Sequence, residues 1–275
     1  MDFLIKTYKN LIETLLEQKY QFSTIEEYFT SKSVSKLIRP VVLMRHDVDR
    51  KPGSALRMAQ LEFMLGVKST YYFRTIPKTF KPEVIKKIAE FGHEIGYHYE
   101  NLSIAQMKNV KCKMKNEEEY TYMLFKVALK DFGKNLDQLR KLYPVKTMCM
   151  HGSPMSKLDN RDLWKTFDYR EYGIICEPYF DLDFNKVFYI TDASRAWNNE
   201  NVSIRDKVES NFDIQIKSTK DIIKLLQSDN APSQIMINIH PHNWANNSLE
   251  WLKICLWQNC KNIVKRQIII FRKAL

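Results

Sequence analysis

Residues 41–51 read VVLMRHDVDRK, an apolar run that leads directly into two aspartates. The composition of 41–46 predicts a buried β-strand. Asp47 and Asp49 are two residues apart, so on an extended chain both side chains project from the same face. Two carboxylates on one face of a buried strand repel each other unless a cation or a proton intervenes. The stretch therefore predicts a strand that ends at a cation-binding site.

The rest of the chain alternates short apolar runs with helix-like segments. Further strands are predicted at 69–74, 93–98, 147–150, 173–177, 187–191 and 234–240, and helices at 54–65, 81–92, 117–142, 160–167, 219–228 and 247–266. This alternation implies right-handed crossovers and a mostly parallel sheet. No Gly-x-Gly-x-x-Gly turn follows the first strand. The sequence thus favours an α/β fold with a closed or nearly closed barrel over an open dinucleotide-binding sheet.

The length of 275 residues fits one large α/β domain. No Gly/Ser/Pro-rich linker or internal repeat divides the sequence. Apolar residues recur at helical spacing in the first 20 residues, between charged ones. We expect an N-terminal helical extension over 1–40, packed on a barrel domain over 41–275.

Cysteine usage and hydropathy indicate a cytoplasmic protein. The five cysteines are odd in number and form no C-x-x-C pair, which suggests a reducing compartment. The N-terminus lacks the unbroken apolar core of a signal peptide, and no window approaches the length of a transmembrane segment.

The formal net charge of +11 favours an anionic partner. The lysines are spread along the chain, however, which is typical of solvated helix faces. No homeodomain, zinc-finger or RNP-like pattern accompanies the charge. Nucleic acid is therefore only a minor alternative among the partners.

Reactive side chains follow or end most of the predicted strands: Asp47, Asp49, His98, His151, Asp192 and His240. The carboxyl ends of parallel strands share one face of a barrel, where barrel enzymes assemble their active sites. Asp and His are ordinary ligands of zinc and related divalent ions. One acid could bind the ion while its neighbour removes a proton from the bound water. His46 and His93 are out of phase with these residues and are expected to point to the opposite face.

At these positions the chain resembles the polysaccharide deacetylase superfamily (NodB homology, carbohydrate esterase 4), in a divergent branch with an HDVD first motif. RHDVD at 45–49 resembles the first motif, GHEIGYH at 92–98 the second and INIHP at 237–241 the last. TDASRAW at 191–197 stands where the family has another acidic motif. The resemblance covers about residues 40–245. It implies a distorted (β/α)7 barrel.

The resemblance also implies roles for single residues. Asp47 would be the catalytic base, Asp49 and His98 ligands of a divalent ion, zinc above all, and His240 the catalytic acid. Asp192 would support His240, with Arg195 as a possible partner for a carboxylate.

The chain departs from the family pattern at Leu102, because the family usually has a second metal-binding His four residues after the first. We favour His151 as the replacement, since two imidazoles and one carboxylate preserve a typical ligand set. Glu100 is the alternative, because it shares a face with His98 on an extended chain. His151 could instead contact the substrate or the base. The family's third motif also carries an Arg near the base, and HGSP at 151–154 has none.

The expected function is a metal-dependent hydrolase that removes an N-acetyl or other N-acyl group from a sugar, such as a cytosolic glycan precursor. Trp197, Trp244 and Tyr99 are candidates for contacts with the sugar ring. The alternative is a deacetylase-like carbohydrate-binding or scaffold protein without activity, and Leu102 is the residue that favours it.

Overall fold

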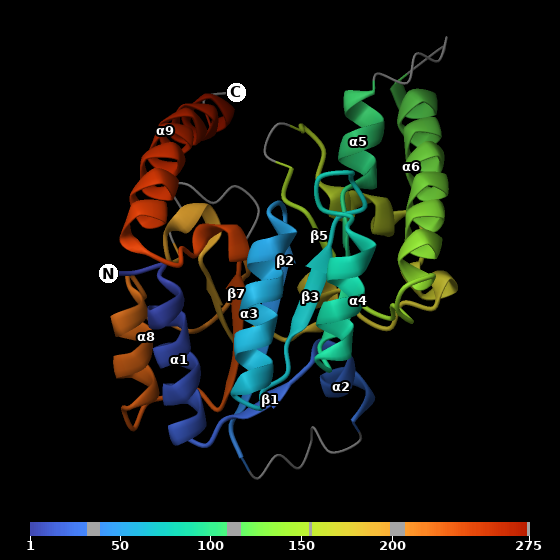
Figure 1. Cartoon of the computed structure of the whole chain (residues 1–275). Coiled ribbons are helices and arrows are strands. Elements are labelled where there is room, and N and C mark those ends of the chain that lie inside the picture. The colour runs from blue at the N-terminus through green and yellow to red at the C-terminus, as the bar shows by residue number, and fades with distance from the viewer. Residues whose placement is uncertain (32–38, 109–116, 154–155, 199–206, 274–275) are drawn as a thin grey trace.

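The computed structural model describes residues 1–31, 39–108, 117–153, 156–198 and 207–273, with side chains up to residue 263. Its centre is a parallel seven-stranded sheet with the order β5-β4-β3-β2-β7-β6, and β1 pairs with β2 (Figure 1). The strands are β1 (Gln21–Ser23), β2 (Val41–Val48), β3 (Thr70–Phe73), β4 (Glu94–Tyr99), β5 (Met148–Met150), β6 (Phe188–Thr191) and β7 (Gln234–Ile239). The predicted α/β class with a parallel sheet is confirmed. The sheet curls into part of a barrel whose edges are β5 and β6.

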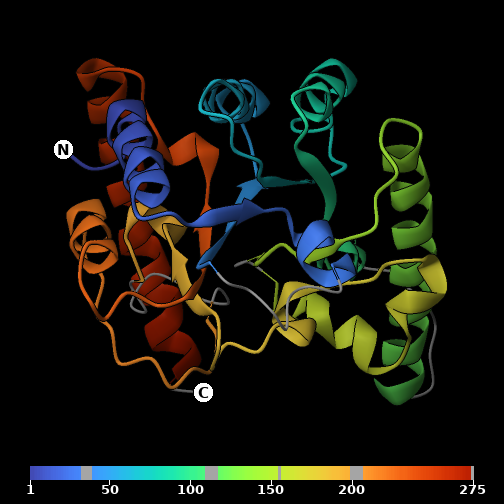
Figure 2. The ribbon, with the colours of Figure 1, turned by 90° about the horizontal axis from the view of Figure 1, so that it is seen from below.

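The α-helices are α1 (Ile5–Glu17), α2 (Ile25–Thr30), α3 (Pro52–Met64), α4 (Pro82–Glu90), α5 (Asn101–Met107), α6 (Glu117–Arg140), α7 (Pro178–Asp181), α8 (Thr219–Leu226) and α9 (Ser248–Lys273). Short 3-10 helices are η2 (Asn160–Lys165), η3 (Tyr169–Tyr172), η4 (Ala193–Arg195) and η5 (Pro241–Asn243). Helices α1, α3, α4 and α6 line the outer side of the curled sheet (Figure 2). No helix among the described residues is both long and apolar enough to cross a membrane.

Strand β2 is buried along its whole length because both of its faces are covered. Val42 and Met44 pack with α1, α3 and α8 in the largest apolar cluster. Val41 and Leu43 face the other way and pack with Tyr72 of β3. The period of two then puts Arg45 and Asp47 on this inner side of the sheet.

The predicted strand at 173–177 is wrong. Cys176 forms only an isolated bridge with Thr147, and the Glu177 side chain accepts the Met150 N–H at 3.0 Å. The Met148 N–H still bonds to the Cys176 carbonyl at 3.1 Å, but the Glu177 carboxylate takes the next edge N–H, so the pairing beside β5 ends there. The helix predicted at 160–167 is instead the 3-10 helix η2.

Candidate metal centre and active site

The reactive residues lie at the carboxyl edge of the sheet, each at the end of a different strand. His98 belongs to the end of β4, His151 follows β5, and Asp192 follows β6. His240 follows β7, the neighbour of β2. Parallel strands bring these ends to one face, as the sequence predicts.

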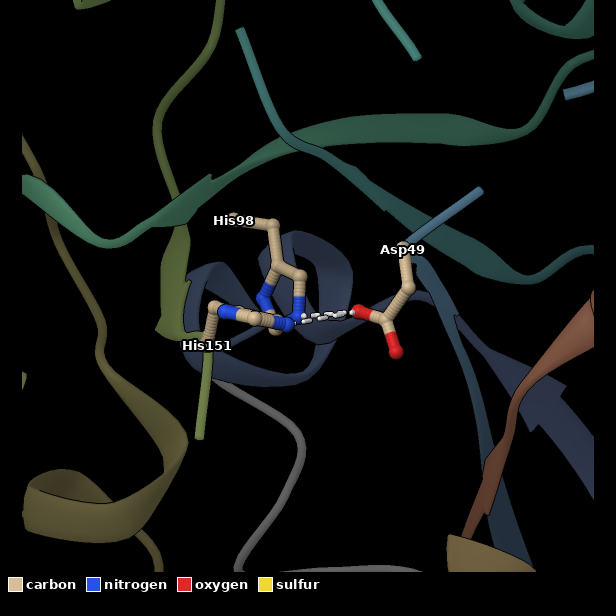
Figure 3. A group of neighbouring side chains, drawn as sticks. All are labelled: Asp49, His98 and His151. Atoms are coloured by element: carbon tan, nitrogen blue, oxygen red, sulfur yellow. Dashed lines mark ion pairs between the residues drawn. The ribbon is translucent and has the colours of Figure 1, made fainter. Parts of the chain in front are cut away.

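Asp49, His98 and His151 converge on one point from three chain segments (Figure 3). Asp49 Oδ1 is 3.3 Å from His98 Nε2 and 3.4 Å from His151 Nε2. Two ligand atoms bound to a tetrahedral zinc ion at about 2.0–2.1 Å are about 3.3–3.4 Å apart, so these distances match an ion's ligand set. Asp49 Oδ1 is also buried and accepts no hydrogen bond from a described residue. These three residues could therefore bind a metal ion.

Both imidazoles are held so that Nε2 faces Asp49. His98 Nδ1 is 2.9 Å from the Cys149 carbonyl oxygen, an acceptor, so the proton lies on Nδ1. His151 Nδ1 is 3.0 Å from Ser153 Oγ and 3.2 Å from Glu100 Oε2. A carboxylate or carbonyl on one ring nitrogen fixes the tautomer and leaves the other nitrogen free for a metal.

Glu100 lies behind His151 and is not one of the three converging ligands. Arg74 donates to both of its carboxylate oxygens, at 2.7 and 2.6 Å, and to the Asp49 carbonyl at 3.1 Å. Burial raises the pKa of Glu100, but His151 and Arg74 outweigh it and lower the pKa to about 2. Glu100 therefore stays ionised and orients His151.

Leu102 points away from the centre because the chain becomes helical at Asn101, the first residue of α5. Its side chain is buried with Leu124 and Ala128 of α6. The position of the family's second histidine is thus part of a helix–helix contact in this chain.

Asp47 is held by Arg45, a residue that the sequence analysis did not single out. Arg45 donates Nε to Oδ1 at 2.9 Å and Nη2 to Oδ2 at 2.6 Å, and Asn238 adds a bond to Oδ2 at 3.2 Å. Oδ2 lies 3.9 Å from His98 Nε2 and 4.0 Å from His240 Nε2. Burial raises the pKa of Asp47, but Arg45 and the two histidines more than offset it, so the pKa is lowered. The i, i+2 spacing of Arg45 and Asp47 on β2 was the available signal.

His240 and Asp192 form a buried pair. His240 donates its backbone N–H and its ring Nδ1–H to Asp192 Oδ1, at 2.8 and 2.7 Å. Trp244 donates its indole N–H to Oδ2 at 2.7 Å. Burial lowers the pKa of His240, but the bond and the charge of Asp192 raise it to about 10. The raised pKa favours the imidazolium form of His240, which has a proton to give.

The three aromatic residues expected to contact a sugar do not reach the surface. Trp244 is fully buried and binds Asp192, Trp197 is buried and donates to Thr219 Oγ1, and Tyr99 is in the core with its hydroxyl on Glu177. Each aromatic is fixed by packing and by a polar partner, so none of the three rings is exposed to a sugar in this structure.

Among the described residues, no carboxylate pairs with Arg195. Its guanidinium lies over the rings of Phe3 and Trp251, 5.1 and 4.7 Å from their centroids. Two of its nitrogens are buried without a hydrogen-bond partner among the described residues. Arg195 therefore packs against the N-terminal segment and against α9.

His46 and His93 face the outer side of the sheet, as their phase predicts. His46 Nε2 is 2.7 Å from Glu62 Oε1, and Tyr71 donates to Glu62 Oε2 at 2.8 Å. His93 Nε2 donates to the Ala59 carbonyl at 2.9 Å. These residues anchor α3 to the sheet, and they belong to no candidate metal-binding group within the described part of the chain.

Comparison with known proteins adds no relative. No protein-family model matches the chain, and no curated protein matches it either. The interpretation of the site therefore depends on its geometry and on the motifs themselves.

Proposed function

We propose that the chain is a metal-dependent hydrolase that removes an N-acetyl or other N-acyl group from a sugar, acting on a glycan precursor in the cytoplasm. The observation that carries the proposal is Asp47 Oδ2, which lies next to the metal-binding cluster and 4.0 Å from the protonated His240. A carboxylate and an imidazolium beside a cation site supply the base and the acid that amide hydrolysis needs. The motif resemblance supports the sugar class and a NodB-like barrel.

Asp49, His98 and His151 would hold the ion. Two imidazoles and one carboxylate are a donor set typical of catalytic zinc, so we infer zinc. When bound, such an ion lowers the pKa of water and polarises an acyl oxygen.

The remaining residues have separate tasks in this proposal. Asp47 takes a proton from the attacking water, whose oxygen forms a bond to the acyl carbon. Arg45 keeps Asp47 ionised and fixes its position. His240 gives its proton to the sugar nitrogen as the C–N bond breaks, which leaves a free amine and a carboxylic acid.

The test is turnover of a panel of N-acetylated sugars by the zinc-loaded protein, with release of acetate and of primary amine both measured. Asp47→Asn should lower the rate by about 100- to 10,000-fold, the usual contribution of a general base, while the zinc content stays at the wild-type level. Asp229→Asn, which changes an exposed carboxylate, is the matched control.

Wild-type turnover by Asp47→Asn would remove Asp47 from the role of base. A zinc-loaded protein that binds the sugars and hydrolyses none would favour the carbohydrate-binding alternative, which Leu102 at the family's usual histidine position supports.

A further inference from the structure

Helix α9 exposes a row of large apolar side chains. Leu249, Leu252, Leu256 and Ile263 are each at least 50% exposed. At about 100° per residue these four positions fall within an arc of about 60° on one side of the helix. We call these four residues the outer stripe; Trp257, which is 64% exposed, lies about 110° around the helix from its centre.

The opposite side of α9 faces the protein. Gln258 is buried, Asn262 donates to the Ser194 carbonyl at 3.1 Å, and Trp251 donates to the Asp2 carbonyl at 2.6 Å. The outer stripe is therefore not the packing surface of the helix. An exposed apolar row of this kind marks an interaction surface.

The charge of α9 indicates what this surface binds. The helix carries six lysines and arginines and one glutamate, so its net charge is +5. Each basic residue near an anionic bilayer contributes about 1 kcal/mol of attraction. Two copies of such a helix would repel each other, which disfavours a second copy as the occupant. Lys253 and Lys261 within the helix would make a transmembrane orientation costly.

We propose that α9 docks in the plane of an anionic lipid bilayer, with the outer stripe inserted at the boundary between headgroups and acyl chains. An amphipathic helix with apolar and basic residues binds membranes in this way. The Asn262–Ser194 contact is two residues from Asp192, so a docked α9 would hold the carboxyl edge of the sheet close to the bilayer.

The test is co-sedimentation of the full chain with vesicles of phosphatidylcholine and phosphatidylglycerol in equal amounts, compared with phosphatidylcholine alone. We expect binding to the anionic vesicles that weakens as salt is raised. Leu252→Glu/Leu256→Glu should weaken that binding at least about tenfold. The double substitution removes apolar area that inserts into the bilayer, and it adds negative charge. Met64→Glu/Met107→Glu, which changes two exposed apolar residues on α3 and α5, is the matched control and should bind like the wild type.

Circular dichroism and thermal unfolding establish that each variant folds, and Leu252→Gln/Leu256→Gln replaces the first variant if it does not. Absence of binding to anionic vesicles, or equal binding by the wild type and the stripe variant, would overturn the proposal. A wild-type dimer in size-exclusion chromatography that the stripe variant converts to a monomer, with vesicle binding unchanged, would assign the stripe to a second copy instead. None of these measurements requires turnover, so the outcome is separate from that of the proposed hydrolase.

Discussion

Glu100 illustrates at the scale of a single residue how a carboxylate can serve a metal site without binding the ion. It holds His151 Nδ1 on one side and the Arg74 guanidinium on the other. We predict that Glu100→Gln lowers zinc affinity about 10- to 100-fold, the usual effect of losing such a supporting carboxylate. Asp49→Ala and His98→Ala remove a ligand and should lose the ion. Competition with a chromophoric chelator measures these affinities.

The control for this series is Glu90→Gln, which changes an exposed carboxylate that pairs with Lys87. Its zinc affinity should equal that of the wild type. If Glu100→Gln lost zinc as completely as Asp49→Ala, Glu100 would be a ligand itself, and the orientation role assigned to it would be wrong.

Glu177 gives a prediction for the dependence of stability on pH. Burial raises its pKa from the usual 4.5 of a glutamate to about 7, despite the N–H groups of Met150 and Tyr179. The unfolded chain releases this proton first as pH rises, so Glu177 favours unfolding increasingly between pH 4.5 and about 7. The shift corresponds to about 3 kcal/mol in the free energy of unfolding.

Glu177→Gln removes this titration. The free energy of unfolding of the variant, relative to the wild type, should therefore rise by about 3 kcal/mol between pH 4.5 and 7.5. Denaturant unfolding at a series of pH values measures it. Glu171→Gln, at an exposed position, is the control and should show a constant difference. The same constant difference in Glu177→Gln would mean that Glu177 is ionised in the folded protein throughout this range.

At the scale of elements, the N-terminal segment supports the His240–Asp192 pair. Leu4 forms a parallel bridge with Ala245, and the Tyr8 and Phe3 rings pack edge-on against Trp244, with centroids 5.3 and 5.4 Å from its own. Trp244 then donates to Asp192. The N-terminal segment and α1 therefore fix Trp244. Trp244 in turn binds Asp192, the partner of the proposed acid His240.

We predict that Trp244→Phe lowers turnover while zinc content is unchanged, because Asp192 Oδ2 loses its donor and the carboxylate is less firmly oriented. The buried unpaired acceptor should also cost about 1–3 kcal/mol of stability. Trp251→Phe is the control. It also removes an indole hydrogen bond, but that bond goes to the Asp2 carbonyl and not to Asp192. The NMR titration of His240 distinguishes the two roles: a pKa that moves only in Trp244→Phe supports positioning, and an unchanged pKa contradicts it.

The elements also show where sequence reasoning succeeds and where it stops. The period of two correctly assigned Asp47 and His46 to opposite faces of β2, because a buried strand leaves no other arrangement. The segment 173–177 has the composition of a strand. Its pairing with β5 ends where the Glu177 side chain takes the Met150 N–H at the edge of the sheet. The start of α5 at Asn101 decides where Leu102 points, and no local pattern marks that start.

At the scale of the whole molecule, the parallel topology brings residues far apart in the sequence to one edge. That rule alone predicts that His98, His151 and His240 meet Asp49 on the same face. It cannot predict which of them surround one point. This depends on differences of less than an ångström in the positions of their side chains. The i, i+2 spacing places Arg45 and Asp47 on one face of β2, but the two hydrogen bonds between them depend on the rotamers of both side chains.

Because the three proposed metal ligands come from the segment after β2, the end of β4 and the segment after β5, binding of an ion should stabilise the folded chain as a whole. A free zinc concentration about 100 times the Kd adds about 2.7 kcal/mol to the free energy of unfolding if the unfolded chain does not bind the ion. For a chain of this size that corresponds to a rise of about 5–10 °C in Tm. A chelator should reverse the rise, and Asp49→Ala should abolish it while Asp229→Asn keeps it. A zinc-dependent rise of equal size in Asp49→Ala would place the ion elsewhere. The chemistry proposed for Asp47 and His240 would then be wrong.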